Sequence, residues 1–589
     1  MRLSRTEPLQ GMLGDHRSHN PTYSAEVYLK GIEAVASILK QEGVEYLFSY
    51  PNHPVIDAAS ALGIRPIIAR SEKTLINMAD GYCRATNGRR PTVLVVQGGP
   101  GIENAFGGLA QAYADGVPLL IIPGGAAARR LGAPVEFDPL PVYRNITKWS
   151  GRINMVERIP ELMRRAFSLI RNGPSAPVLL ELPSDVGQAT IDDASIQYTP
   201  PRRFTSGGDP ALVAEAVREL LTARRPVLHA GQGVLWAEAT DELRELAELV
   251  QAPVFTTMAG KSAFPEDHPL SIGSGGHTTT RQAAHFFLKS DLIFGIGAGF
   301  ARSGFAVTIP AGKKIVQITS DPRDIDKDYA THLAVLGDAK VVLQQIIFEV
   351  KRQAGAKARK GNTDLTDEIK SVRDEYLKEW MPRLTSDESP ISPYRVIREL
   401  GLAADRANTV VTHDSGNPRD QTLTFYEALT PRGYLGWGKS TQLGTGYGIA
   451  MGAKLAFPDK LCVNIMGDLA FGTAGMEVET AVRERIAIMT ILVNNSVMGG
   501  YGHHMPTASQ KFGANQLSGN YSKVAEGLGA YTERVELAAD VSGAIKRGIA
   551  ATQQGRTVLL EMITREEPVY PASVGLLASL ANELSTPTY

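Results

Sequence analysis

Cysteine is scarce in this sequence, and neither sign of charge is in clear excess. The 589 residues contain two cysteines, Cys83 and Cys462, too few for a disulfide framework or a cysteine-rich zinc site. Lys and Arg number 61 against 62 for Asp and Glu, which gives a formal net charge of −1. A nearly neutral chain has no global electrostatic attraction to nucleic acid or to an anionic membrane. We therefore expect neither as a partner.

Long apolar runs are also missing. The longest, at residues 117–123 and 486–493, have the length of one strand and are too short to span a bilayer. Residues 1–25 are polar, are interrupted by Gly and Pro, and lack the apolar core of a secretory signal. These absences predict a cytoplasmic protein with a loose N-terminal arm at residues 1–24 and a short C-terminal tail at residues 576–589.

The composition that remains is that of a folded protein, with 43% hydrophobic and 21% charged residues. The length predicts three or four domains. Residues 195–209 combine a Pro pair with Gly and charge, and residues 353–366 are polar and basic, so both stretches are typical of linkers. We expect domains at residues 25–195, 205–352 and 390–575.

Within each domain, short runs of Val, Ile and Leu alternate with longer amphipathic stretches. This alternation predicts an α/β fold with three doubly wound parallel-sheet domains. The first and third domains share a design, in which an apolar strand (residues 92–96 or 461–466) is followed by a polar turn, a helix and a second strand. The shared design suggests that the two domains are related, although any doubly wound domain contains such units.

The middle domain has two strands, at residues 225–230 and 292–296, that end in Gly231-Gln232-Gly233 and Gly297-Ala298-Gly299. A Gly-x-Gly turn after a strand can admit a pyrophosphate to a helix N-terminus. Neither turn has the full dinucleotide pattern with an acidic residue at the right distance. A nucleotide site and a merely structural domain both remain open.

Asp468 and Asn495 carry the most informative spacing. Gly467-Asp468 follows one apolar strand, Asn494-Asn495 ends the next, and 27 residues separate Asp468 from Asn495. That distance accommodates a helix and a returning parallel strand, so both side chains reach the same edge of the sheet. Carboxylate, amide and carbonyl oxygens suit Mg²⁺ when phosphate oxygens complete the octahedron. Helix N–H groups near Leu469 and Ala470 can hold the same phosphates. Two helix-capping turns are the structural alternative.

Gly-Asp followed after about 27 residues by Asn-Asn resembles the thiamine diphosphate motif of the acetolactate synthase and pyruvate decarboxylase superfamily. The resemblance extends from about residue 25 to about residue 573, although Leu469 stands where the family usually has a third glycine. The phrase at residues 467–480 is most similar to 2-hydroxyacyl-CoA lyases and oxalyl-CoA decarboxylases. The resemblance implies that Asp468, Asn495 and the Val497 carbonyl bind Mg²⁺, and that Gly467, Leu469 and Ala470 border the diphosphate.

The resemblance also assigns residues in the first domain, which would bind the pyrimidine ring. Glu72, in Arg70-Ser71-Glu72 after the strand at residues 66–69, corresponds to the glutamate that activates the cofactor by a proton relay. Without the resemblance, a glutamate at a strand end is usually a solvated or capping residue. By the same likeness, residues of the Gly-Pro-Gly loop lie around the pyrimidine: Gln97, Pro100 and Asn104.

Three further residues are assigned by resemblance, each with a structural alternative. Leu443, on the Gly-rich stretch 440–446, matches the bulky wedge between the two thiamine rings, but it can also be a core leucine. Asn417 lies in a turn, residues 414–417, that is similar to a diphosphate-contacting turn. His53 occupies the loop position that faces the reactive thiazolium carbon, where it can donate to an oxyanion or move a proton, or else cap a turn.

The resemblance implies a thiamine diphosphate- and Mg²⁺-dependent lyase or carboligase that forms an enamine and acts on a 2-oxo acid. A CoA-thioester enzyme and a catalytically inactive regulatory protein are the alternatives. The synthases' Phe-Gln pair falls on Pro134 and Val135, their Trp after Asn-Asn is missing, and His503 and His504 have no assigned role. The family likeness further implies a homodimer or homotetramer, and FAD or the ADP part of CoA in the middle domain.

Overall fold

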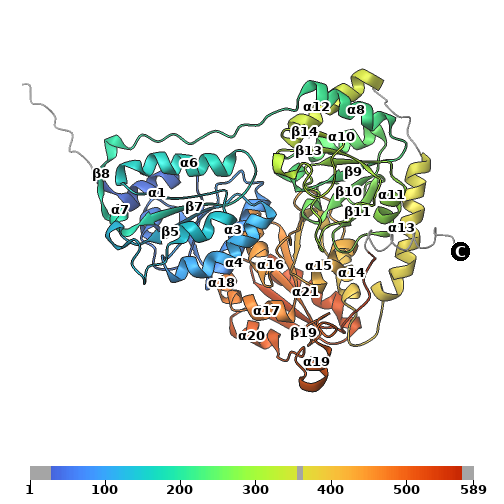
Figure 1. The fold of residues 1–589 in the computed structure, drawn as a ribbon. Coiled ribbons are helices and arrows are strands. Elements are labelled where there is room, and N and C mark those ends of the chain that lie inside the picture. The colour runs from blue at the N-terminus through green and yellow to red at the C-terminus, as the bar shows by residue number, and fades with distance from the viewer. Residues whose placement is uncertain (1–27, 355–362, 573–589) are drawn as a thin grey trace, which may run out of the picture.

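The computed structural model describes residues 28–354 and 363–572. The predicted N-terminal arm (1–24) and C-terminal tail (576–589) therefore lie outside the described residues. Figure 1 shows three α/β units, of which the first contacts the third and is joined to the second by a long connecting segment. Residues 196–209, all of them described, form that segment without helix or strand.

The N-terminal domain is built on a six-stranded sheet in the order β3-β2-β4-β5-β7-β6, with every neighbouring pair parallel. Its strands are β2 (Tyr46–Ser49), β3 (Arg65–Ile68), β4 (Val93–Val96), β5 (Leu120–Gly125), β6 (Trp149–Arg152) and β7 (Val178–Pro183). Its α-helices are α1 (Gly31–Gln41), α2 (Val55–Ala61), α3 (Glu72–Ala85), α4 (Pro100–Asp115), α5 (Pro139–Tyr143), α6 (Ile159–Arg171) and α7 (Ser184–Gln188). A short antiparallel pair, β1 (Tyr28–Lys30) and β8 (Thr190–Asp192), closes the domain.

The middle domain has a second parallel sheet, in the order β11-β10-β9-β12-β13-β14. Its strands are β9 (Pro226–Ala230), β10 (Val254–Thr257), β11 (Ser271–Gly275), β12 (Leu292–Ile296), β13 (Lys314–Thr319) and β14 (Leu333–Leu336). The covering helices are α8 (Pro210–Thr222), α9 (Gln232–Trp236), α10 (Thr240–Val250), α11 (Arg281–Lys289) and α12 (Ala339–Ala354). Numbered within the domain, the strand order is 3-2-1-4-5-6, the order of dinucleotide-binding folds.

The C-terminal domain has a third parallel sheet, in the order β16-β15-β17-β18-β20-β19. Its strands are β15 (Thr409–His413), β16 (Tyr434–Leu435), β17 (Leu461–Gly467), β18 (Met489–Asn494), β19 (Tyr531–Val535) and β20 (Val558–Ile563). Its helices are α13 (Thr363–Leu384), α14 (Pro393–Ala403), α15 (Asn417–Phe425), α16 (Thr445–Ala456), α17 (Asp468–Ala474), α18 (Glu477–Arg483), α19 (Pro506–Phe512), α20 (Tyr521–Gly527) and α21 (Val541–Gln553).

Numbered within each domain, the first and third sheets have one and the same strand order, 2-1-3-4-6-5. The expectation of two domains with a shared design is therefore met in the topology. All three sheets are parallel, and their apolar strands are covered by helices, as the alternating sequence pattern predicts.

The expected linker at residues 353–366 is wrong at both ends. Helix α12 continues to Ala354 and α13 begins at Thr363, so residues 353–354 and 363–366 are helical, and residues 355–362 lie outside the described residues. Helix α13 is polar on average, but it buries Tyr376 and Trp380 against the C-terminal domain. A polar average hides an apolar stripe of this kind, because only one face of such a helix is buried.

Helices α3 and α16 join the N-terminal domain to the C-terminal domain through close backbone contact. A Cβ on Gly81 would lie 2.2 Å from the Ile449 carbonyl oxygen, and one on Gly452 would lie 1.9 Å from the Met78 carbonyl oxygen. Only glycine permits this approach. The first residue of α3 and the loop before α16 thereby come to the same end of the helix pair. In the part of the chain that the structure describes, no helix has the length and apolar character needed to cross a membrane.

Candidate active site

Glu72 is the first residue of α3, immediately after the turn that follows β3. Ser71 caps the helix, because its Oγ accepts the Thr74 N–H at 3.2 Å. The Glu72 side chain is buried, and burial raises the pKa of its carboxyl, while a backbone N–H and the Asn104 side chain counter the rise by hydrogen bonding. The structure thus brings Glu72 together with Asn104, a residue of α4.

Gln97 and Pro100 lie in the loop between β4 and α4, beside Glu72. Pro100 is the first residue of α4, where its missing N–H costs nothing, and Gly99 before it adopts a φ of +66°. The carbonyl of Gln97 accepts the Ile102 N–H at 3.0 Å, which fixes the loop, and both Gln97 and Pro100 are at least partly exposed. The loop therefore presents its side chains toward open space at the carboxyl edge of the sheet.

His53 is buried in the loop between β2 and α2. Its Nδ1 accepts the Val55 N–H at 3.4 Å, and its Nε2 has no hydrogen-bond partner among the described residues. Burial lowers the pKa of the ring to about 4, so the ring is neutral at neutral pH. A neutral ring whose Nδ1 accepts carries its proton on Nε2. This arrangement favours donation of a hydrogen bond over proton transfer near neutral pH.

Leu443 lies in a loop that both domains hold in place, called here the wedge loop (residues 438–446). Lys73, next to Glu72, donates from Nζ to the Leu443 carbonyl, and Gln442 donates from Nε2 to the Gly107 carbonyl at 2.8 Å. The Leu443 side chain is partly buried against the apolar cluster that includes α3 and α16. The loop that carries Leu443 is therefore brought beside the helix that begins with Glu72.

Asp414, at the end of β15, anchors the far side of the wedge loop. Its carboxylate accepts the N–H groups of Ser415 at 2.8 Å and of Gly444 and Gly446 at 2.9 Å each. The side chain is fully buried, and burial raises its pKa to about 6 against the opposing effect of these N–H groups and of Lys73. The resemblance implies that the turn at residues 414–417 contacts a diphosphate; in this structure its aspartate binds the N–H groups of Gly444 and Gly446, just after Leu443.

Asp468 and Asn495 meet at the carboxyl ends of β17 and β18, which are adjacent and parallel. One Asp468 oxygen accepts the Leu469 N–H at 2.8 Å and the other accepts the Ser496 N–H at 2.9 Å, which joins the two strand ends. Burial raises the pKa of Asp468. Asn495 accepts the Val497 N–H at 3.1 Å, forming a turn that directs the chain around the same edge.

Asn417, the first residue of α15, completes this cluster. A Cβ on Gly499 would lie 2.5 Å from the Asn417 amide nitrogen and 3.6 Å from that of Asn495, so both side chains face the same glycine. Among residues 28–354 and 363–572 there is no group of three or more His, Cys, Asp or Glu side chains that could hold a metal. One carboxylate together with amide and carbonyl oxygens suits Mg²⁺ only if phosphate oxygens supply further ligands to the ion. A bound diphosphate would supply those oxygens. The residues therefore fit a metal–diphosphate group.

Residues Gly467, Leu469 and Ala470 belong to the strand end and to the first turn of α17, beside Asp468. Val497 pairs with Gln516 in an isolated bridge of the following loop. His503 and His504, farther along that loop, are exposed, and their ring centroids lie 4.0 Å apart. They belong to no metal cluster among the described residues.

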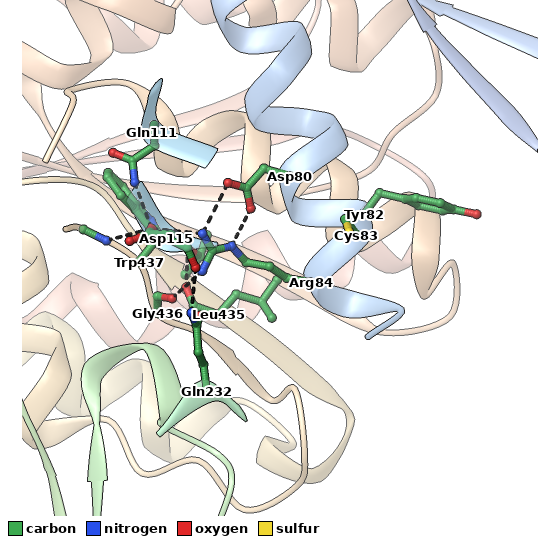
Figure 2. A network of polar contacts seen from close by, with 12 residues as sticks. Asp80, Tyr82, Cys83, Arg84, Gln111, Asp115, Gln232, Leu435, Gly436 and Trp437 are labelled. Atoms are coloured by element: carbon green, nitrogen blue, oxygen red, sulfur yellow. Dashed lines mark hydrogen bonds and ion pairs between the residues drawn. The ribbon is translucent and has the colours of Figure 1, made fainter. Parts of the chain in front are cut away.

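A buried ion network that no motif indicates joins all three domains (Figure 2). Arg84 of α3 binds Asp80 through Nε and Nη2, binds Asp115 through Nη2 at 2.9 Å, and donates from Nη1 to the Gly436 carbonyl at 3.0 Å. Asp115 in turn accepts the N–H groups of Gly438 and Lys439 at the start of the wedge loop, at 3.2 and 3.1 Å. Gln232 of the middle domain donates to the Asp115 carbonyl at 2.6 Å. Apart from the Arg84–Asp80 pair, which lies one turn apart on α3, these contacts are between residues far apart in the sequence, so local patterns carry no signal for them.

A cavity of about 590 Å³ borders this network at Gln232 and Lys439, at the point where the strand order of the middle sheet reverses between β9 and β12. All three domains contribute to its lining, which includes Tyr113, Gly231, Gln232, Gly299, Asp321 and Lys439. The glycine turns after β9 and β12 touch, because a Cβ on Gly231 would lie 2.2 Å from the Gly297 carbonyl oxygen. Asp321, two residues after β13, places a carboxylate in the lining of this cavity.

Comparison with known proteins agrees with this geometry. Residues 29–148 match the N-terminal TPP binding domain of thiamine pyrophosphate enzymes, residues 213–346 their central domain, and residues 414–562 their C-terminal TPP binding domain. Each match falls within one of the three parallel-sheet domains described above.

Full-length relatives are similar over most of the chain. A probable acetolactate synthase large subunit from Methanococcus aeolicus is 30% identical over 88% of this chain and 90% of its own length. Acetolactate synthase isozyme 3 large subunit from Escherichia coli K12 is 26% identical over 93% and 97%, and glyoxylate carboligase from Escherichia coli O157:H7 is 29% identical over 91% and 94%. The chain thus belongs to the thiamine pyrophosphate-dependent enzymes, within their acetolactate synthase-like superfamily.

Proposed function

We propose that this enzyme is a thiamine diphosphate- and Mg²⁺-dependent carboligase or lyase that acts on a 2-oxo acid. The observation that carries the proposal is the contact between Lys73, which follows Glu72, and the Leu443 carbonyl. This contact joins the acidic start of α3 in one thiamine-binding domain to the wedge loop of the other. The names of the relatives, acetolactate synthase and glyoxylate carboligase, support 2-oxo acids over CoA thioesters.

Each part of the site has a task in this proposal. Asp468, Asn495 and the Val497 carbonyl hold Mg²⁺ and, through it, the diphosphate, while the first turn of α17 offers its N–H groups to the phosphates. Leu443 would be the wedge residue of the bound cofactor, and Gln97, Pro100 and Asn104 would border its pyrimidine. Glu72 relays a proton at the pyrimidine nitrogen, for which a carboxyl of raised pKa is suited. When bound, thiamine diphosphate supplies the electron sink for making or breaking the carbon–carbon bond.

Two variants test the assignment together. We expect Asp468→Ala to lose cofactor binding in calorimetry, because it removes the sole carboxylate of the metal site. We expect Glu72→Gln to bind the cofactor but to lower kcat with small 2-oxo acids by about 10²–10⁴-fold, the usual size of a lost acid–base group. Tight cofactor binding by Asp468→Ala, or near-normal turnover by Glu72→Gln, would overturn the assignment. Aldehyde release from 2-hydroxyacyl-CoA thioesters, but no turnover of 2-oxo acids, would favour the CoA-thioester class instead.

We also propose that the middle-domain cavity binds an adenine nucleotide moiety, as part of FAD. The strand order 3-2-1-4-5-6, the touching glycine turns after β9 and β12, and Asp321 at the end of β13 support it. The acidic side chain can accept from ribose hydroxyls, and the glycine turns can admit a pyrophosphate. The absorbance spectrum of the purified enzyme tests the proposal: a flavin spectrum supports FAD, whereas a colourless enzyme that binds CoA but not FAD in equilibrium dialysis contradicts it.

We further propose at least a homodimer, and by family likeness a homotetramer. In the family that this chain resembles, the activating glutamate and the diphosphate site meet across a subunit interface. In this structure the two domains that carry them are in contact within one chain. The same contacts form between two chains if their N-terminal domains are exchanged through residues 196–209. Sedimentation at working concentration checks the assembly, and a fully active monomer at nanomolar concentration would refute it.

A further inference from the structure

Glu477, the first residue of α18, reaches from the C-terminal domain into the N-terminal domain. Its Oε1 accepts the Ser71 N–H at 2.8 Å and the Ser71 hydroxyl at 3.1 Å, and its Oε2 accepts the Arg70 N–H at 3.1 Å. Thr480, one turn along α18, donates from Oγ1 to Oε2 at 2.6 Å and fixes the carboxylate. The side chain is only 2% exposed. Four donors therefore converge on one buried carboxylate that no catalytic motif explains.

The two backbone donors are the residues immediately before Glu72. They belong to the turn between β3 and α3, so the positions of their N–H groups set where the first residue of α3 lies. A buried backbone N–H that loses its acceptor is unfavourable, and hydrogen bonds to a carboxylate are stronger than those to a neutral group. The carboxylate of Glu477 thus holds the backbone of residues 70–71. The position of Glu72, the next residue, is set by that backbone.

We propose that Glu477 is a positioning residue for Glu72: by binding the Arg70 and Ser71 N–H groups across the domain boundary, it fixes the activating carboxylate relative to the cofactor. The proposal rests on the proposed function of Glu72. It also explains how the thiamine site becomes competent only when the two domains are docked, because the anchor and the activating group belong to different domains.

Glu479 provides a matched control on the same helix. It also reaches the N-terminal domain, but it binds the Arg70 guanidinium at 3.3 Å rather than the backbone, and its side chain is 28% exposed. An exposed ion pair of this kind contributes little to stability. Glu479→Gln therefore removes a charge and an interdomain contact from α18 without releasing the turn before Glu72.

The first experiment uses the enzyme without added cofactor. We expect Glu477→Gln to speed hydrogen exchange at the amides of residues 70–72, because the amide side chain has one acceptor oxygen where the carboxylate offered two. Glu479→Gln should leave those amides unchanged. Unchanged exchange in Glu477→Gln would overturn the proposal. If Glu477→Gln fails to fold, Thr480→Val replaces it, since this variant removes one support of the carboxylate and should give a smaller increase at the same amides.

The second experiment follows deuterium exchange at the thiazolium C2 of bound thiamine diphosphate, together with cofactor affinity. We expect Glu477→Gln to slow C2 exchange about 10- to 100-fold, the size of a displaced catalytic group, with cofactor affinity changed less than about threefold. In the double variant with Glu72→Gln, C2 exchange should be no slower than in Glu72→Gln alone, because Glu477 acts through Glu72.

An additional slowing in the double variant, or an equal effect of Glu479→Gln, would overturn the positioning role. If Glu72→Gln itself leaves C2 exchange unchanged, the proposed function of Glu72 fails, whereas the amide exchange of the cofactor-free enzyme still decides whether Glu477 holds the turn. The two failures are therefore distinguishable.

Discussion

At the scale of single residues, His53 illustrates how a backbone contact decides the chemistry of a side chain. The Val55 N–H donates to Nδ1, which leaves the proton on Nε2, the nitrogen without a partner among the described residues. Because burial lowers the pKa of the ring to about 4, His53 is uncharged in the working range of most enzymes. In the proposed site, the Nε2–H group can therefore donate a hydrogen bond to a substrate oxygen. Protonating the buried ring to an imidazolium is unfavourable in free energy, so His53 does not act as a charged acid.

We predict that His53→Ala lowers kcat/KM about 10²–10³-fold, the cost of one lost oxyanion donor, and that His53→Gln, whose amide can also donate, recovers part of that loss. Because the wild-type ring stays neutral, the ratio of wild-type to His53→Ala activity should be constant from about pH 6 to pH 8. Steady-state kinetics across that range check both statements. A ratio that falls as the pH rises would mean that a protonated His53 takes part in catalysis.

The sequence could indicate Asp468 and Asn495, because each stands at the end of a strand where a parallel sheet presents its ligands. It indicated Glu72 and His53 only through the family resemblance. It could not indicate Lys73, Asp414 or Glu477 in their observed roles. Their partners lie about 30 to 400 residues away, and the contacts of Lys73 and Glu477 cross from one domain to another. The tautomer of His53 was equally out of reach, since it depends on one backbone N–H and on burial.

At the scale of elements, the wedge loop is held by hydrogen bonds rather than by its own secondary structure. Asp115 binds its first two N–H groups, Ser415 binds the Thr441 carbonyl at 2.9 Å, and Asp414 binds Gly444 and Gly446. Gly444 adopts a φ of +82°, and a Cβ there would lie 2.2 Å from the Thr473 hydroxyl oxygen. The loop therefore needs glycine at its turn and acidic side chains at both of its ends.

Asp414 makes the stability of this element depend on pH. Its folded pKa of about 6 lies above the usual value of 3.8, so the contribution to stability is fully present below pH 3.8 and is lost as the pH rises through about 6. We predict that cofactor-free wild type, measured relative to Asp414→Asn, loses up to about 3 kcal/mol of unfolding free energy between pH 4 and pH 7. Urea unfolding at several pH values measures the difference. A relative gain in stability over that interval would mean that the folded pKa is depressed, not raised.

At the scale of the whole molecule, the Arg84 network connects the three domains at one buried point (Figure 2). Asp80 and Asp115 come from the N-terminal domain, the Gly436 carbonyl and the wedge loop from the C-terminal domain, and Gln232 from the rim of the middle-domain cavity. A guanidinium with five donors can satisfy several acceptors in fixed directions, which a lysine cannot. The network therefore ties the position of the wedge loop to that of the middle-domain cavity.

We predict that Arg84→Met destabilises the enzyme by about 3–5 kcal/mol, because it leaves two buried carboxylates without their cation although the side-chain volume is nearly kept. Arg89→Met is the matched control: Arg89 also links the N-terminal domain to the middle domain, through Glu238 at 2.6 Å, but both side chains are 44% exposed. Its loss should cost at most about 1 kcal/mol of unfolding free energy.

Urea unfolding monitored by tryptophan fluorescence suits the measurement, since Trp437 is fully buried beside Gly436, a partner of Arg84. Equal destabilisation by the two variants would show instead that the buried network adds nothing beyond an ordinary surface ion pair.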